Sequence, residues 1–429
     1  MRRLMIDSVV TWVRDYQVDG FRFDLMGHHM VEDMRAVREA LDSLTLEEDG
    51  VDGASIYVYG EGWDFGEVAN NTRGVNATQL NLPGTGIGTF NDRLRDAVRG
   101  GNPFGGLQEQ GFSNGLFTDP SSFDQGTPEE QQARLLLFAD QIRAGLAGNL
   151  RDYSFEGASG DMITGADLDY NGFPVAYTLD PQEHIVYVSA HDNETIFDVI
   201  QAKAPETATV ADRVRMHNMA LSIVALSQGV PFFHAGDDML RSKSLDGNSY
   251  DSGDWFNRLD FTYQTNNWAV GLPPAWDNEG KWDVTAPLLE TAALVPAPDD
   301  IMNGVMHLRE MLAIRSSSPL FRLQTADAVF ERVAFHNTGP EQVPGVIIMS
   351  IADLEGEDLD PDHELIVVVF NATPEAQMLS VTDLEGVSLS LHPLQAESHD
   401  PVVQTASFAA DSGTLTVPAR TTAVFVLGE

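Results

Sequence analysis

Three carboxylates in this sequence stand at the ends of short apolar runs, where a side chain is well placed for acid–base chemistry. They are Asp24, Glu61 and Asp192. In a parallel α/β barrel the carboxyl ends of the strands meet on one face, so acids that are far apart in the sequence can share one pocket. Two carboxylates on either side of a scissile bond are what glycoside hydrolysis needs, and a third can stabilise positive charge in the transition state. The alternative is three unrelated structural acids.

Each of these acids has a neighbour suited to contact with a sugar or with the acid itself. Arg22 precedes Asp24 by two residues, Trp63 follows Glu61 by two residues, and His191 directly precedes Asp192. An arginine beside a carboxylate favours the charged form of that carboxylate, and an aromatic ring offers a flat apolar face. Core packing is the alternative role for the tryptophan, and an isolated ion pair is the alternative role for Arg22.

The elements that must position these residues alternate between strand and helix. Apolar runs bounded by turn residues predict five strands, and spacing of 3.6 residues predicts six helices. This alternation indicates βαβ units and a parallel sheet. The stretch 99–126 is rich in Gly, Pro, Ser and Asn and is expected to be a long surface loop. The expected strands cover 18–24, 55–61, 86–91, 185–189 and 230–234, and the expected helices cover 4–16, 29–44, 92–98, 127–148, 207–228 and 301–315.

The sequence changes character near Ser317, which divides the chain into two expected domains, 1–317 and 318–429. The second part contains short β-rich runs separated by Pro, Gly and acidic turns, which is typical of an antiparallel β-sandwich. These runs cover 328–335, 346–351, 365–370, 415–417 and 422–427.

The composition excludes several classes of function. The 429 residues carry a formal net charge of −40, which argues against nucleic acids and anionic membranes as partners. A neutral sugar is compatible with this charge. Lysine occurs only at Lys203, Lys243 and Lys281, and there is no cysteine, so disulfides and thiolate chemistry are excluded. No apolar run has the length that crosses a membrane.

Three stretches of the sequence resemble the α-amylase superfamily of retaining glycoside hydrolases. They are DGFRFDLMGHH at 19–29, YGEGWDFGEV at 59–68 and YVSAHDNET at 187–195. Within that superfamily the motifs MGHH at 26–29, GWDFG at 62–66 and SYDSGDWFN at 249–257 are similar to pullulanases, the α-1,6-cleaving debranching enzymes. The sequence from 318 onward also resembles the C-terminal domain of this subgroup.

The resemblance implies a role for each matching residue. Asp24 matches the nucleophile, Glu61 the general acid/base and Asp192 the transition-state stabiliser. The matched substrate-binding residues are Arg22, which holds the nucleophile ionised, His191 as a ligand of sugar hydroxyls, Trp63 as a stacking platform, His28 as a pocket-lining residue, and Asn248 and Tyr250 as contacts to an outer sugar. For His28, capping of the turn is the alternative role.

The resemblance also implies a (β/α)8-type barrel, of which only five strands are expected here. The chain begins just before what would be the fourth strand, so an incomplete barrel of about strands 4 to 8 is expected, followed by the β-sandwich. The missing N-terminal part of the same enzyme is therefore an expected partner. Without it, unpaired strand edges would leave the chain poorly folded or inactive. A secreted or cell-surface location is favoured over a cytoplasmic one.

The function that follows from the resemblance is hydrolysis of α-1,6 branch linkages in pullulan, amylopectin and limit dextrins. An α-1,4-acting relative and a non-catalytic glucan-binding fragment are the alternatives. No cofactor is required by this chemistry, although the resemblance allows calcium. Asp167, Asp169 and Asn171 match the start of a calcium loop, but Thr178 stands where that loop needs Glu, which favours a turn stabilised by its own side chains.

Overall fold

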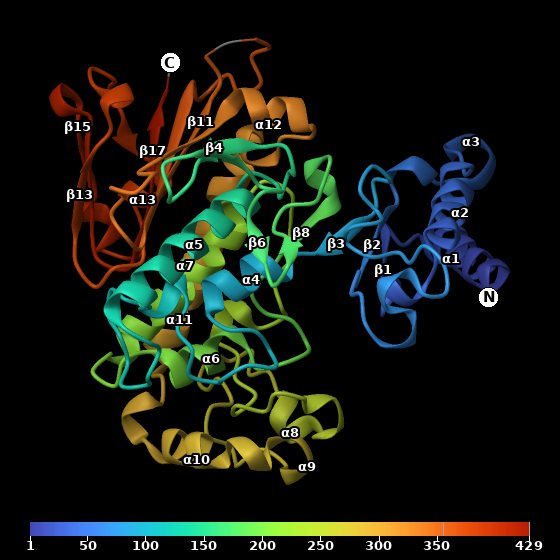
Figure 1. Cartoon of the computed structure of the whole chain (residues 1–429), viewed down its shortest axis with the longest axis horizontal. Coiled ribbons are helices and arrows are strands. Elements are labelled where there is room, and N and C mark those ends of the chain that lie inside the picture. The colour runs from blue at the N-terminus through green and yellow to red at the C-terminus, as the bar shows by residue number, and fades with distance from the viewer. Residues whose placement is uncertain (355, 429) are drawn as a thin grey trace.

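The computed structural model describes every residue of the chain except 355 and 429. Its centre is a sheet of five parallel strands whose spatial order, β1-β2-β3-β8-β9, follows their order in the chain (Figure 1). The predicted parallel sheet is therefore confirmed. The strands are β1 (Gly20–Phe23), β2 (Tyr57–Gly60), β3 (Gly88–Phe90), β8 (His184–Val186) and β9 (Val230–Pro231).

Helices fill the connections, and side chains at their starts explain where they begin. Thr127 and Glu130 form a reciprocal capping box at the start of α5, and Thr209 and Asp212 form one at the start of α7. The main helices are α1 (Arg2–Tyr16), α2 (Val31–Asp42), α4 (Asp92–Arg99), α5 (Pro128–Leu146), α6 (Ile196–Lys203), α7 (Val210–Leu226) and α11 (Pro298–Ser317). Shorter helices are α3 (Leu46–Asp49), α8 (Asp254–Asn257), α9 (Ala275–Asn278), α10 (Trp282–Glu290), α12 (Ala326–Arg332) and α13 (Pro393–Ala396). Within the described residues, none of the helices is both long enough and apolar enough to cross a membrane.

Two separate hydrophobic cores support the parallel sheet. The first packs side chains of α1 and α2 against β1 and β2, and the second surrounds α5, α7 and β8. In Figure 1 the first core forms the blue lobe, which stands apart from the rest of the molecule. The sheet joins the two parts through β2 and β3, which pair at Tyr59↔Gly88 and Gly60↔Thr89.

The face of the sheet opposite these helices carries a layer of aromatic rings. Phe90 lies at its centre, with ring centroids 5.8 Å from Tyr59, 5.1 Å from Tyr187 and 5.1 Å from Phe232. Tyr59 and Phe232 are only half-buried. A closed barrel buries its inner face completely, so this layer is less covered here than in a closed barrel.

The C-terminal part contains two antiparallel sheets that share one core. One sheet has the order β10-β11-β12-β17-β14 and the other β13-β16-β15, and apolar side chains of both form one cluster. The other side of the larger sheet packs into the core around α5 and α7. The strands are β10 (Val333–His336), β11 (Val346–Ala352), β12 (Leu365–Asn371), β13 (Gln377–Ser380), β14 (Ser390–Leu391), β15 (Ser407–Ala409), β16 (Thr414–Val417) and β17 (Thr421–Leu427). Two small hairpins complete the fold: β4 (Ser154–Glu156) with β5 (Met162–Thr164), and β6 (Asp169–Tyr170) with β7 (Phe173–Pro174).

Two expectations from the sequence are wrong. The run 328–335 is mostly helical, because the Thr325 side chain accepts the N–H of Ala328 and starts α12, so the strand begins only at Val333. The stretch 99–126 is not a surface loop throughout. Phe112 is 1% exposed and Leu116 is 0% exposed, and both side chains pack into the second core.

Candidate active site

Arg22 on β1 connects two of the three candidate acids. Its guanidinium donates to Asp24 Oδ1 at 2.9 Å and also to Glu61 Oε1. The N–H of Leu25 donates to Glu61 Oε2 at 2.9 Å. The parallel pairing of β1 with β2 places these groups side by side, because Arg22 lies opposite Tyr59, two residues before Glu61. Charge-assisted hydrogen bonds of this kind fix both carboxylates in place.

The turn after β1 packs directly against the segment that carries Glu61. The N–H of Gly27 donates to the backbone oxygen of Glu61 at 2.8 Å. A Cβ atom at Gly27 would lie 2.0 Å from the backbone oxygen of Trp63, closer than atoms can approach. Glycine is therefore required at this position, and the motif after β1 and the motif after β2 form one structural unit.

Burial separates the environments of the candidate acids. Glu61 is 7% exposed, whereas the side chain of Asp24 is 73% exposed and that of Asp192 is 62% exposed. Glu61 is therefore shielded from solvent, whereas the carboxylates of Asp24 and Asp192 are accessible to a substrate. The three carboxyl groups therefore lie in different environments.

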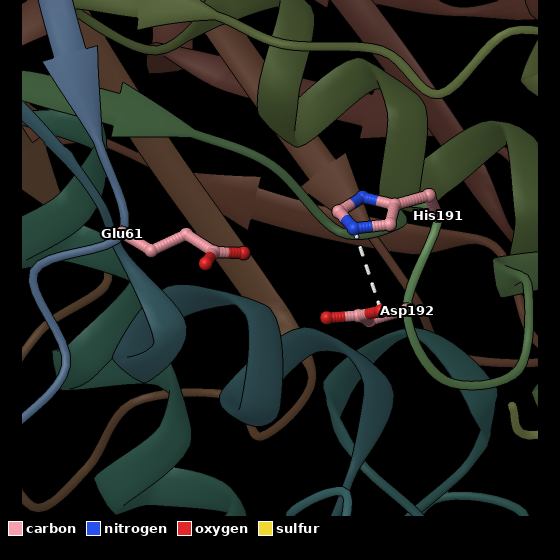
Figure 2. Close-up of side chains that lie close together, drawn as sticks. All are labelled: Glu61, His191 and Asp192. Carbon is pink, nitrogen blue, oxygen red and sulfur yellow. Dashed lines mark ion pairs between the residues drawn. The ribbon is translucent and has the colours of Figure 1, made fainter. Parts of the chain in front are cut away.

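The turn after β8 brings His191 and Asp192 toward Glu61 (Figure 2). His191 Nε2 lies 3.4 Å from Asp192 Oδ1, and polar atoms of Glu61, His191 and Asp192 all lie within 4.8 Å of one another. The carboxylates of Glu61 and Asp192 point toward each other in Figure 2. The structure thus brings together residues that are 131 positions apart, from 61 to 192.

The same three side chains offer two carboxylates and an imidazole, a donor set that a divalent cation accepts. Both oxygens of Glu61, however, already accept hydrogen bonds from Arg22 and from the N–H of Leu25. A cation would have to compete with the guanidinium for this carboxylate. The local charges therefore favour carboxylate chemistry over metal binding.

The remaining candidate residues lie in two groups. Trp63 is half-buried and packs beside the aromatic layer, and the His28 ring lies edge-on to Phe65 with centroids 4.7 Å apart. Asn248 and Tyr250 belong to the loop after β9. Tyr250 is 79% exposed and its ring meets Trp276 edge-on at 5.6 Å, so this second group forms an aromatic surface of its own.

The loop that resembled a calcium site is the turn between β6 and β7. Asp167 Oδ2 accepts the N–H and hydroxyl of Thr164 at 2.8 and 2.7 Å, and Asp169 Oδ1 accepts the N–H of Gly172 at 3.0 Å. Thr178, at the position where a calcium loop has its Glu, is 1% exposed. One oxygen of each of these aspartates therefore accepts hydrogen bonds from nearby residues of the chain, which supports the turn interpretation.

Asp198 is a structural residue of the site that the motifs did not reveal. It is 0% exposed in the first turn of α6, and its oxygens accept the hydroxyl of Ser242 and the N–H groups of Lys243 and Leu245. It thereby fixes the loop after β9 to the helix that follows Asp192. In the sequence, Asp198 could have been noticed because it lies three residues after Thr195, whose side chain caps α6.

We expect Asp198 to make the free energy of unfolding dependent on pH. Burial raises the pKa of Asp198 from 3.8 to about 6. Between these values the folded protein keeps a proton that the unfolded chain has lost, so the stabilisation is full below pH 3.8 and disappears as the pH rises through 6. Relative to an Asp198→Asn variant, the native chain should lose about 3 kcal/mol across this window. Urea unfolding at several pH values measures this difference, and parallel pH curves for the two proteins would contradict it.

The chain is similar in sequence to known proteins. Residues 263–427 match the family described as "Alpha-1,6-glucosidases, pullulanase-type, C-terminal". The chain is 50% identical to Pullulanase 1, chloroplastic, of Arabidopsis thaliana, covering 99% of this chain and 45% of the relative. It is 39% identical to a pullulanase of Klebsiella pneumoniae, covering 99% of this chain and 38% of the relative.

Solved structures agree with these matches. The maltotriose complex of PulA from Klebsiella pneumoniae superposes with a TM-score of 0.92 at 40% identity, covering 100% of this chain and 45% of that one. Apo pullulanase from Paenibacillus barengoltzii superposes with a TM-score of 0.68 at 28% identity, covering 100% of this chain and 50% of that one. The chain thus spans half or less of the length of these proteins. Over its whole length the chain is similar to these pullulanases, and it corresponds to the carboxyl-terminal portion of those longer proteins.

Proposed function

We propose that residues 1–429 carry the catalytic acids of a retaining glycoside hydrolase that cleaves α-1,6 linkages in branched α-glucans. The observation that carries this proposal is the convergence of Glu61 with Asp192 and His191, with Asp24 linked to Glu61 through Arg22. The relatedness to pullulanases supports the choice of linkage. The proposed substrates are pullulan, amylopectin and limit dextrins.

In the proposed mechanism the exposed Asp24 attacks the anomeric carbon and forms a covalent glycosyl-enzyme intermediate. Arg22 holds the attacking carboxylate in place, since its guanidinium donates to Asp24 Oδ1 at 2.9 Å. Glu61 protonates the departing oxygen, and in the second step it removes a proton from the water that releases the sugar. Asp192 stabilises the positive charge that develops on the sugar ring. These steps need no cofactor.

The remaining candidate residues are proposed to bind the sugar units. His191 donates to hydroxyl groups beside Asp192, and Trp63 and His28 line the pocket near the reacting bond. Asn248 and Tyr250 contact an outer sugar, which agrees with the 79% exposure of the Tyr250 ring. Aromatic faces of this kind bury the apolar side of a glucose unit.

We further propose that the five parallel strands are strands 4 to 8 of a (β/α)8 barrel, with the first three supplied by a preceding part of the same protein. The half-buried rings of Tyr59 and Phe232 in the aromatic layer support this proposal, because further strands would cover them. The proposed boundary between a catalytic domain, 1–317, and a β-sandwich domain, 318–429, coincides with the end of α11 at Ser317. A secreted or cell-surface location is part of the proposal, although one relative is named as chloroplastic.

The test is digestion of pullulan by the 429-residue chain and by the longest reading frame that contains it. Maltotriose as the product indicates α-1,6 cleavage, and products cut at other positions indicate an α-1,4-acting enzyme. Glucan binding without hydrolysis by either protein would indicate a binding function and would overturn the proposed activity. Hydrolysis by the longer protein alone would show that the added strands are needed.

A further inference from the structure

The position of Asp192 depends on the backbone of its turn. The side chains of His191 and Asp192 are 59% and 62% exposed. Within the described part of the chain, these two side chains make a polar contact with each other, His191 Nε2 to Asp192 Oδ1 at 3.4 Å. Glu61, by contrast, is held by the Arg22 guanidinium and the Leu25 N–H. The residues that hold residues 189–195, here called the Asp192 turn, therefore determine where the Asp192 carboxylate lies.

Cationic side chains from three different parts of the fold hold the Asp192 turn. Lys243, in the loop after β9, donates from Nζ to the backbone oxygen of His191 at 3.0 Å. Lys281, just before α10, donates from Nζ to Glu194 Oε1 at 2.6 Å. Arg99, at the end of α4, donates to the backbone oxygens of Val188 and Glu194 at 3.0 and 2.9 Å. These contacts hold the Asp192 turn at His191 and Glu194, and hold the residue just before it, Val188.

Two of these cations, Lys243 and Arg99, are buried, which is costly for a charged group, whereas the Lys281 side chain is 34% exposed. Lys243 is 0% exposed, Arg99 is 7% exposed and Glu194 is 4% exposed. Lys243 is bonded here to a neutral backbone oxygen, while Asp198, Asp246, Glu194 and Arg241 act on it through their charges. Burial lowers the pKa of the Lys243 ammonium to about 8. A buried charge bonded to a neutral group adds little stability and is better explained by the geometry it imposes.

The few lysines of the chain lie near the Asp192 turn. The chain has 25 basic residues, of which only Lys203, Lys243 and Lys281 are lysines. Lys203 ends α6, is 4% exposed, and donates to the backbone oxygen of Gly100, next to Arg99. It lines the same small cavity as Glu194 and Lys281. All three lysines therefore lie in one cluster around the Asp192 turn.

We propose that Lys243 and Lys281 are positioning residues that hold the Asp192 turn so that the Asp192 carboxylate faces the reacting sugar. The inference rests on the proposed function of Asp192. It goes further because it assigns the placement of this acid to two residues that do not touch the substrate. Loss of either lysine is expected to destabilise the transition state, because a displaced Asp192 stabilises the positive charge on the sugar ring less well. Binding of the outer sugars should stay the same.

The first experiment measures kinetics on pullulan with Lys243→Met and Lys281→Met variants of whichever protein hydrolyses it. Loss of such a supporting contact is expected to lower kcat by about 10–100-fold with KM changed by less than about threefold. Lys281→Arg should restore most of kcat, because it keeps a cation beside Glu194. Arg322→Met removes one positive charge from an exposed site outside the cluster and should change neither constant. Unchanged kcat in both lysine variants, or a rise in KM alone, would overturn the proposal.

A second experiment tests the same contacts without enzyme activity, so that it stays informative even if pullulan is not hydrolysed. Amide hydrogen exchange across 191–195 in the 429-residue chain should be at least about 10-fold faster in Lys243→Met. The reason is that loss of the Lys243 contact to His191 lowers the free energy of local opening of the turn. Exchange in β1 and β2 should be unchanged. If Lys243→Met does not fold, the half-buried Lys281 provides the same comparison through its Met and Arg variants. Equal exchange across 191–195 in the native and Met proteins would contradict the proposal.

Discussion

Replacing Asp24 by asparagine is expected to lower kcat on pullulan by at least about 10⁴-fold, because removal of a nucleophile abolishes the covalent step. The amide keeps the shape of the side chain but cannot attack the anomeric carbon. Arg22 would still donate to the remaining oxygen, so the local fold should survive. Binding of maltotriose, measured by calorimetry, should change by less than about threefold, since this binding precedes chemistry.

Asp19→Asn is the matched control for this variant. Asp19 is also an exposed aspartate and stands just before β1, but it is not one of the candidate site residues. Its substitution should leave kcat unchanged. An Asp24→Asn protein that keeps a tenth or more of the native rate would show that Asp24 is not the nucleophile. A native protein that binds maltotriose without any turnover would instead favour the glucan-binding alternative.

Replacing Glu61 by glutamine is expected to lower kcat on pullulan by about 10²–10⁴-fold, the usual contribution of a general acid–base group. The loss should depend on the leaving group. An α-glucosyl fluoride needs no protonation on departure, so formation of the glycosyl-enzyme intermediate from it should be nearly normal. Added azide should then restore turnover, because this anion attacks the intermediate without help from a general base. The glycosyl azide product should keep the α configuration and can be identified by NMR.

Glu67→Gln is the control, because Glu67 is an exposed glutamate in the segment that follows Trp63. It should retain native kinetics on both substrates. An equal loss of activity on pullulan and on the fluoride would argue against a general acid role for Glu61. Glu61 also accepts hydrogen bonds from the Leu25 N–H and the Arg22 guanidinium. If the loss of these bonds were the cause of lower activity, activity on all substrates would fall alike.

The parts of the fold that could be predicted from the sequence are those in which local signals agree. The helix beginning at Pro128 has a Thr cap, a Pro in its first turn and a Glu that closes the capping box, and it forms as expected. The strands before Asp24, Glu61 and Asp192 are indicated by short apolar runs, although β1 has no fully buried residue. Their parallel pairing follows from the helical connections between them.

The features that escaped prediction depend on contacts between distant residues. Phe112 and Leu116 lie in a Gly- and Ser-rich stretch that looks like a surface loop, yet they are buried by helices elsewhere in the chain. The apolar residues of 326–332 fit a strand or a helix equally well, and the Thr325 cap decides for the helix. In the candidate site, no local pattern shows that Lys243 reaches the backbone of His191, because 52 residues separate them.

The division of the parallel sheet between two hydrophobic cores affects how the protein responds to heat. Asp24 and Glu61 directly follow strands packed on the first core, whereas Asp192 follows a strand packed on the second. Only a short pairing between β2 and β3 joins these parts within the sheet. A small rotation of one part against the other would widen the gap between the acids while each core stayed intact. Thermal inactivation should therefore precede thermal unfolding, and cooling should restore activity as long as neither core has melted.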